Sequence, residues 1–202
     1  MLEEYNINQT TLKILGLYAG DYQKSFHLRE IARETGVDVK TIHLQLKRLE
    51  KMNILSSTMK GRNKEHSLNL RNLAAKYYMV MAETLASVRF LQDNFVIKKV
   101  AGEIDAVPSI VLLFGSFAKG RATKDSDIDL FVITDKRIDR NMMMEKGDLI
   151  GRAINIKSCT QAQFMKALQD RDPLILEVVS DHIVLKGVDE FCGILWRYHA
   201  RH

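Results

Sequence analysis

Residues 113–130 read LFGSFAKGRATKDSDIDL, a run in which an apolar strand gives way to a glycine turn and a second strand opens with paired acids. The first strand is expected over residues 110–114 and ends at Gly115-Ser116. Side chains two residues apart on a strand point to the same face, so the carboxylates of Asp127 and Asp129 are expected to converge on one point.

Two like charges held that close repel each other unless a cation lies between them. Hard oxygen ligands suit Mg²⁺, or Mn²⁺ in its place, and Mg²⁺ usually keeps a substrate phosphate as a further ligand. Gly115 lets the backbone approach a phosphate, and the hydroxyl and N–H of Ser116 can donate hydrogen bonds to it. The pattern therefore favours phosphoryl or nucleotidyl transfer.

The same stretch resembles the signature of the nucleotidyltransferase superfamily related to DNA polymerase beta, and most closely its minimal nucleotidyltransferase branch. The resemblance extends over roughly residues 95–190. It implies that a nucleoside triphosphate binds at the glycine turn and that Asp127 and Asp129 are the catalytic, metal-binding pair. The nucleotide-binding residues expected on this basis are Gly115, Ser116, Lys119, Gly120 and Ser126.

One position departs from the superfamily pattern, which places a third carboxylate on the adjacent strand. The matching residue is Asn155, whose amide brings no charge to a metal and cannot act as a general base. Asp148 is the alternative third acid if the register differs. Two hypotheses follow: an enzyme that transfers a nucleoside monophosphate to a hydroxyl, and a catalytically degenerate module that senses nucleotide. The resemblance also suggests an antitoxin-like module that pairs with a small helical partner protein.

The N-terminal part has a different pattern. Helices are expected over residues 10–19, 28–35 and 39–52, with a short strand at 25–27 and two strands at 54–59 and 65–70. Gly36 suits the end of the second helix and Asp38 the N-cap of the third. Residues 60–64 form the expected hairpin tip. This layout resembles a winged helix-turn-helix domain over residues 8–70.

Charge supports a nucleic-acid partner for that region. The chain of 202 residues has a formal net charge of +5. Between Val39 and His66 there are seven basic and two acidic residues, so this segment accounts for the whole excess. By the resemblance, the third helix enters the major groove of double-stranded DNA and the hairpin contacts phosphates. The expected DNA-binding residues are Lys40, Thr41, His43, Leu44, Lys47, Arg48, Lys60, Arg62 and Lys64.

The expected fold class is α+β, with an N-terminal winged helix-turn-helix domain and a C-terminal nucleotidyltransferase-type mixed sheet with flanking helices. The expected divisions are residues 1–70, a linking helix at 71–94 and the second domain at 95–202. Further strands are expected at 128–133, 154–157 and 183–186, and helices near 163–169 and 174–180. The linking helix carries apolar residues at helical spacing, and either pairs with its copy in a homodimer or packs against the protein's own domains. These residues are Tyr78, Met81, Leu85 and Val88.

Composition excludes several classes of protein. Hydrophobic residues make up 46% of the chain and charged residues 27%, which excludes disordered and low-complexity classes. Two cysteines, Cys159 and Cys192, are too few for a disulfide framework. No secretory signal or membrane-length apolar run is found. We therefore expect a soluble cytoplasmic DNA-binding protein, a transcriptional regulator, with no membrane partner.

Overall fold

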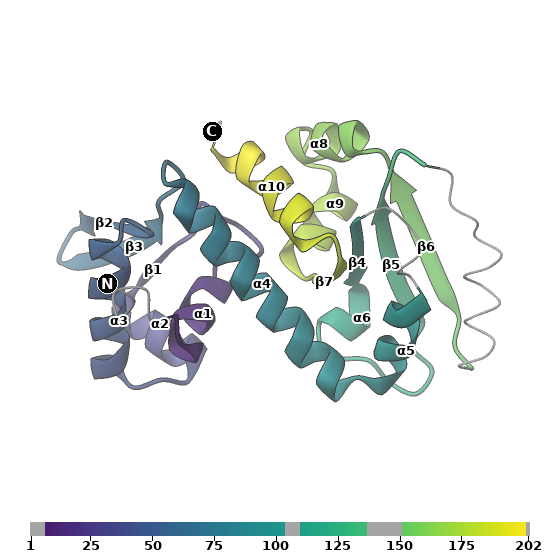
Figure 1. Ribbon diagram of the computed structural model, residues 1–202, viewed down its shortest axis with the longest axis horizontal. Coiled ribbons are helices and arrows are strands. Elements are labelled where there is room, and N and C mark those ends of the chain that lie inside the picture. Colours follow the sequence, from purple (N-terminus) through teal and green to yellow (C-terminus); the bar gives the residue numbers. More distant parts are fainter. Residues whose placement is uncertain (1–6, 104–109, 137–150, 201–202) are drawn as a thin grey trace. The chain divides into compact units, whose positions relative to one another are not determined.

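The computed structural model describes residues 7–103, 110–136 and 151–200 (Figure 1). The described chain contains both helices and strands, and the strands form two separate sheets, as expected for an α+β protein. It divides into two compact units, one of residues 1–85 with 195–202 and the other of residues 86–194. None of the described helices combines the length and apolar character needed to cross a membrane.

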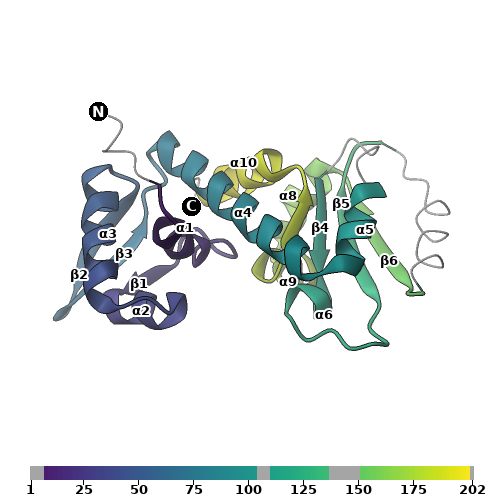
Figure 2. The ribbon, with the colours of Figure 1, turned by 60° about the horizontal axis from the view of Figure 1, so that its bottom comes forward.

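Residues 9–68 of the first unit form three helices and a small antiparallel sheet (Figure 2). The elements in chain order are α1 (Gln9–Gly16), β1 (Ser25–His27), α2 (Leu28–Thr35), α3 (Val39–Lys51), β2 (Leu55–Lys60) and β3 (Asn63–Leu68). The strand order is β1-β3-β2. Lys60 pairs with Asn63, so the hairpin turn consists of Gly61 and Arg62 alone and is tighter than the five-residue tip expected from the sequence.

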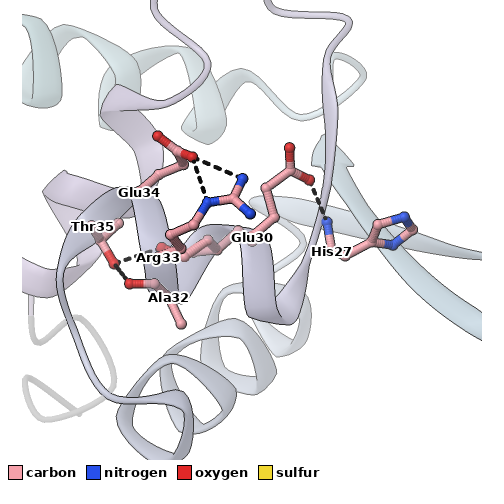
Figure 3. Close-up of polar contacts among 7 residues, drawn as sticks. His27, Glu30, Ala32, Arg33, Glu34 and Thr35 are labelled. Carbon is pink, nitrogen blue, oxygen red and sulfur yellow. Dashed lines mark hydrogen bonds and ion pairs between the residues drawn. The ribbon is translucent and has the colours of Figure 1, made fainter.

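Local side-chain contacts set the helix boundaries of this unit. Asp38 is the N-cap of α3, as expected, and its carboxylate accepts a hydrogen bond from the backbone N–H of Thr41 at 2.9 Å. At the start of α2, the Glu30 carboxylate accepts a hydrogen bond from the backbone N–H of His27 (Figure 3). Gly36 ends α2 with a φ of 66°, which confirms the expected left-handed cap.

The last residues of the chain pack within the first unit. Helix α10 (Val188–His199) brings Trp196 edge-on to Tyr22, with ring centroids 6.1 Å apart. The His199 ring stacks on the same tyrosine at 5.5 Å. Gln23 Nε2 also donates a hydrogen bond to the carbonyl oxygen of His199. The first unit is therefore built from both ends of the sequence.

Helix α4 (Leu73–Asp93) contains the division between the two units, which falls between Leu85 and Ala86. Among the residues proposed above as a dimer seam, Tyr78 is buried, whereas Val88 is 47% exposed. The Asn94 side chain donates a hydrogen bond to the Phe90 carbonyl where α4 ends. A separate helix, α5 (Phe95–Glu103), follows and was not expected from the sequence.

The second unit is built around a four-stranded mixed sheet with the order β6-β5-β4-β7 (Figure 1). β4 runs antiparallel to β5 and β7, whereas β5 and β6 are parallel. The elements besides α5 are β4 (Ile110–Phe114), α6 (Gly115–Ala118), β5 (Ile128–Ile133), β6 (Ile154–Cys159), α8 (Gln161–Gln169), α9 (Pro173–Ser180) and β7 (Ile183–Lys186).

The two faces of this sheet differ. Leu113, Leu130 and Val132 belong to a mainly aliphatic core cluster that includes Ile97 and Val100 of α5. On β5, Asp129 and Phe131 alternate with the core residues and therefore lie on the opposite face. There Phe131 packs against the ring of Phe114 at 6.4 Å and against that of Phe164 of α8 at 5.8 Å. Asp129 thus extends from the aromatic face of the sheet.

Candidate functional sites

Three polar side chains meet where β5 and β6 begin. Asp129 of β5 pairs with Asn155 of β6 in the parallel ladder. The Asn155 Nδ2 atom donates hydrogen bonds to Asp127 Oδ2 and to Asp129 Oδ1, each at 3.3 Å. The convergence of the two carboxylates expected from their spacing is therefore confirmed, and Asn155 occupies the position beside both of them.

These side chains offer hard oxygen ligands that fit a Mg²⁺ or Mn²⁺ ion. The described ranges contain no cluster of three or more His, Cys, Asp and Glu residues suited to a metal, and the two described carboxylates at this position are those of Asp127 and Asp129. Turning the Asn155 amide by 180° presents its oxygen in place of its N–H groups. Asp148, the alternative third acid, lies outside the described residues. The set suits a cation that takes its remaining ligands from a bound phosphate.

Gly115 is required by the position of Asp129. Its φ is +71°, in the left-handed region that glycine adopts most easily. A Cβ atom at this position would overlap Asp129 Oδ2 and come within 3.2 Å of Asp129 Cγ. The glycine turn and the acid pair are therefore packed against each other, with Ser116 next to the point of contact.

The loop between the glycine turn and the acids is fixed by Arg152. Its Nη1 atom donates hydrogen bonds to the carbonyl oxygens of Thr123 at 3.1 Å and Ser126 at 2.8 Å. The guanidinium lies 5.3 Å from the centroid of the Phe117 ring. The Ser126 hydroxyl accepts a hydrogen bond from the Thr123 N–H at 2.8 Å, so this predicted nucleotide-binding residue holds the loop closed. Sequence reasoning missed Arg152, for which the only signal is its place two residues before β6.

The other two residues predicted to bind nucleotide differ in their surroundings. Gly120 is exposed and has a φ of +65°, and a Cβ atom added to it would meet no other atom within 4 Å. Lys119 Nζ lies 2.6 Å from Glu177 Oε1 and 3.9 Å from Asp181 Oδ2, both near the end of α9. A phosphate contact by Lys119 would require this ion pair to open.

Residues 96–191 match the family model described as "Polymerase beta, Nucleotidyltransferase". The second unit contains a nucleotidyltransferase-fold domain. The match includes all four strands of the mixed sheet and both acids of the site. No match was found among curated proteins or among solved structures.

Beyond the nucleotidyltransferase domain, the predicted DNA-binding residues of α3 gather on one exposed side of that helix. Ile42, Gln45, Leu46 and Leu49 face the interior of the first unit. Val39, at the first position of the helix, is 46% exposed. The residues on the exposed side are Lys40, His43, Leu44, Lys47 and Arg48, with Thr41 half-buried beside them.

The β2–β3 hairpin is less basic than its sequence indicates. Lys64 Nζ lies 2.8 Å from Glu50 Oε1 of α3, and Lys60 Nζ lies 3.3 Å from Glu65 Oε1. Arg62, at the turn, is exposed and makes no ion pair among the described residues. The two acids of the basic segment thus offset two of the three basic residues in the hairpin.

The hairpin also contains a buried histidine. His66 is 5% exposed, and its Nδ1 atom lies 3.0 Å from Glu50 Oε1. Burial lowers the pKa of His66 below its ordinary value, although the Glu50 carboxylate opposes that shift. Burial alone would raise the pKa of Glu50, but hydrogen bonds from Lys64 and Ser57 bring it below the ordinary value. Glu50 therefore connects α3 to the hairpin as a carboxylate.

Proposed function

We propose that the protein is a DNA-binding transcriptional regulator whose nucleotidyltransferase-fold domain binds a nucleoside triphosphate together with Mg²⁺ or Mn²⁺. The observation that carries the nucleotide part is the convergence of Asp127 and Asp129 against Gly115 inside the matched domain. Asp127 and Asp129 would hold the divalent cation. The backbone at Gly115 and the Ser116 hydroxyl would hold phosphate oxygens.

A divalent cation supplies charge neutralisation and orients the triphosphate when bound. The chain's own residues do the rest. Arg152 keeps the loop before Asp127 in place, and the sheet holds Asp129 at a fixed distance from the glycine turn. Isothermal titration of the full chain with Mg²⁺ and non-hydrolysable nucleoside triphosphates tests this part. Binding by the wild type and loss of binding in Asp127→Asn support nucleotide binding at this site. Absence of binding to the analogues of ATP, GTP, CTP and UTP contradicts it.

Asn155 favours nucleotide sensing over rapid transfer. In nucleotidyl transfer the attacking hydroxyl loses a proton to a general base. The Asn155 amide, which lies beside both acids, cannot accept that proton. Transfer of a nucleoside monophosphate to a hydroxyl is the alternative. Incubation with labelled triphosphates, Mg²⁺ and cell lysate distinguishes the two. Sensing predicts binding without label transfer in the wild type, whereas transfer that depends on Asp127 establishes the enzyme.

The DNA part rests on the exposed basic side of α3. Three helices followed by a paired hairpin, in the sheet order β1-β3-β2, support a winged helix-turn-helix arrangement for the first unit. In such a domain the exposed side of α3 would enter the major groove. Lys47 and Arg48 lie on that side without a described acidic partner.

Fluorescence anisotropy with double-stranded DNA selected from a random library tests the DNA part. The double variant Lys47→Gln, Arg48→Gln should abolish binding at moderate salt. Lys166→Gln, an exposed lysine of α8, serves as the matched control and should bind as the wild type does. Equal binding by the double variant and the control would overturn the assignment.

A further inference from the structure

Lys157 stands on the same strand and face as Asn155. The two residues are two apart on β6, so their side chains leave the sheet on the same side. In the ladder, Asp129 pairs with Asn155 and Phe131 pairs with Lys157. On this face of β6, Lys157 is therefore the next residue along the strand after Asn155, which lies beside both acids.

The Lys157 side chain extends across the sheet toward the site. Its Nζ atom lies 6.0 Å from the centroid of the Phe114 ring. Phe114 belongs to β4 and pairs with Asp129, so the ammonium has crossed β5 to reach a ring beside the acid. An ammonium over an aromatic face is weakly held, and it remains available to an anion.

Charge at the site distinguishes Lys157 from the other basic residues. Lys119, the lysine next to the glycine turn, is paired with Glu177 and faces Asp181. The Arg152 guanidinium is committed to two carbonyl oxygens of the loop. Lys157 is exposed and has no described acidic partner.

Solvent reaches Lys157 from a pocket of about 520 Å³ on the aromatic face. This pocket lies between β6 and helices α8 and α9, and its lining includes Phe131, Lys157 and Leu174. Nothing in the pocket lining except Asp172 carries negative charge, and the Asp172 carboxylate accepts a hydrogen bond from the Ile175 N–H as the N-cap of α9. The Lys157 ammonium is therefore open to solvent on the face of the sheet that carries Asp129.

We propose that Lys157 is a nucleotide-binding residue, whose ammonium contacts the phosphate that lies at Asp129. This inference rests on the proposed nucleotide binding and names a cation for it that the motif does not contain. The two aspartates already offset the charge of one divalent cation. The negative charge of a bound triphosphate therefore needs positive charge from another residue of the site. Lys157 supplies positive charge from the strand opposite the glycine turn.

The test compares two lysine variants in the full chain: Lys157→Gln and Lys166→Gln. Each is titrated with Mg²⁺ and the non-hydrolysable analogue, among those of ATP, GTP, CTP and UTP, that the wild type binds most tightly. Loss of one charge-assisted contact should weaken binding by Lys157→Gln about tenfold or more. Lys166→Gln, an exposed lysine of α8 outside the site, should bind as the wild type does.

Two further measurements separate binding from a structural effect. Lys157→Arg keeps the charge and should recover most of the affinity, and the midpoint of thermal unfolding should be the same for all the variants. Affinity of Lys157→Gln within twofold of the wild type, or an equal loss in Lys166→Gln, overturns the inference while leaving the proposed function intact. Failure of the wild type to bind any analogue overturns the proposed function, and the inference with it.

Discussion

At the scale of single residues, Gly115 meets two requirements: it adopts a positive φ at a turn, and it leaves room for the Asp129 carboxylate. The sequence alone indicates only the turn. A glycine after a strand indicates a turn, but the contact with Asp129 depends on how β4 and β5 pair. Asn155 differs in this respect. Its place between Asp127 and Asp129 was predicted, because strand spacing and the superfamily pattern indicate it. The ion pair of Lys119 with Glu177 was not, because 58 residues separate the two.

Gly115→Ala should be more damaging than Gly120→Ala, although both glycines have a positive φ. Each alanine costs about 1 to 2 kcal/mol from the left-handed backbone. Only at Gly115 does the added methyl group also displace the Asp129 carboxylate. Thermal unfolding and Mg²⁺-nucleotide titration check this: Gly115→Ala should lose stability and binding, and Gly120→Ala stability alone. Intact binding in Gly115→Ala would mean that Asp129 does not hold the cation.

The burial of His66 should make the folding stability of the first unit depend on pH. Its folded-state pKa lies below the ordinary value of 6.5, so between these two values the unfolded chain binds more protons than the folded chain. Stability should therefore fall as the pH drops below about 6.5 and continue to fall to the folded pKa. Urea unfolding between pH 7.5 and 5, followed by circular dichroism, measures the slope. His66→Gln should flatten it, and an unchanged slope would assign the effect to other groups.

At the scale of secondary-structure elements, the sequence predicted the elements with strong local signals. Strands β4, β5 and β7 and helix α2 have the expected bounds. Helix α5 was missed because the chain offers no strong start signal after Asn94, and its burial depends on the distant sheet. The hairpin tip was expected at residues 60–64 but consists of Gly61 and Arg62 alone, because pairing between β2 and β3 extends to Lys60 and Asn63.

The ion pairs of the hairpin predict that its basic residues contribute unequally to DNA binding. Arg62 has no described acidic partner, whereas Lys64 is held by Glu50. If the hairpin lies on the DNA backbone, Arg62→Gln should reduce the salt dependence of DNA binding by about one phosphate contact. Lys64→Gln should change it less. Anisotropy titrations over a range of NaCl concentrations give both slopes, and a larger effect of Lys64 would show that the Glu50 ion pair opens on DNA.

At the scale of the whole molecule, the proposed binding of DNA and of nucleotide falls on regions that differ in net charge. The basic excess lies in the segment from α3 to the hairpin, and the remainder of the chain is balanced. DNA binding by counterion release should weaken by at least about a hundredfold between 50 and 200 mM salt. Nucleotide binding through a glycine turn, a cation and one lysine should weaken by less than about tenfold. Equal slopes for the two ligands would contradict this division.

The packing of Trp196 and His199 on Tyr22 has a consequence for the order of events on the ribosome. Residues near position 22 leave the exit tunnel long before residues 196–199, and the whole nucleotidyltransferase domain is synthesised between them. The first unit therefore gains its last contacts only when the C-terminal helix has emerged. A nascent chain stalled before α10 should carry a first unit with Tyr22 uncovered, whatever the progress of the domain that follows it.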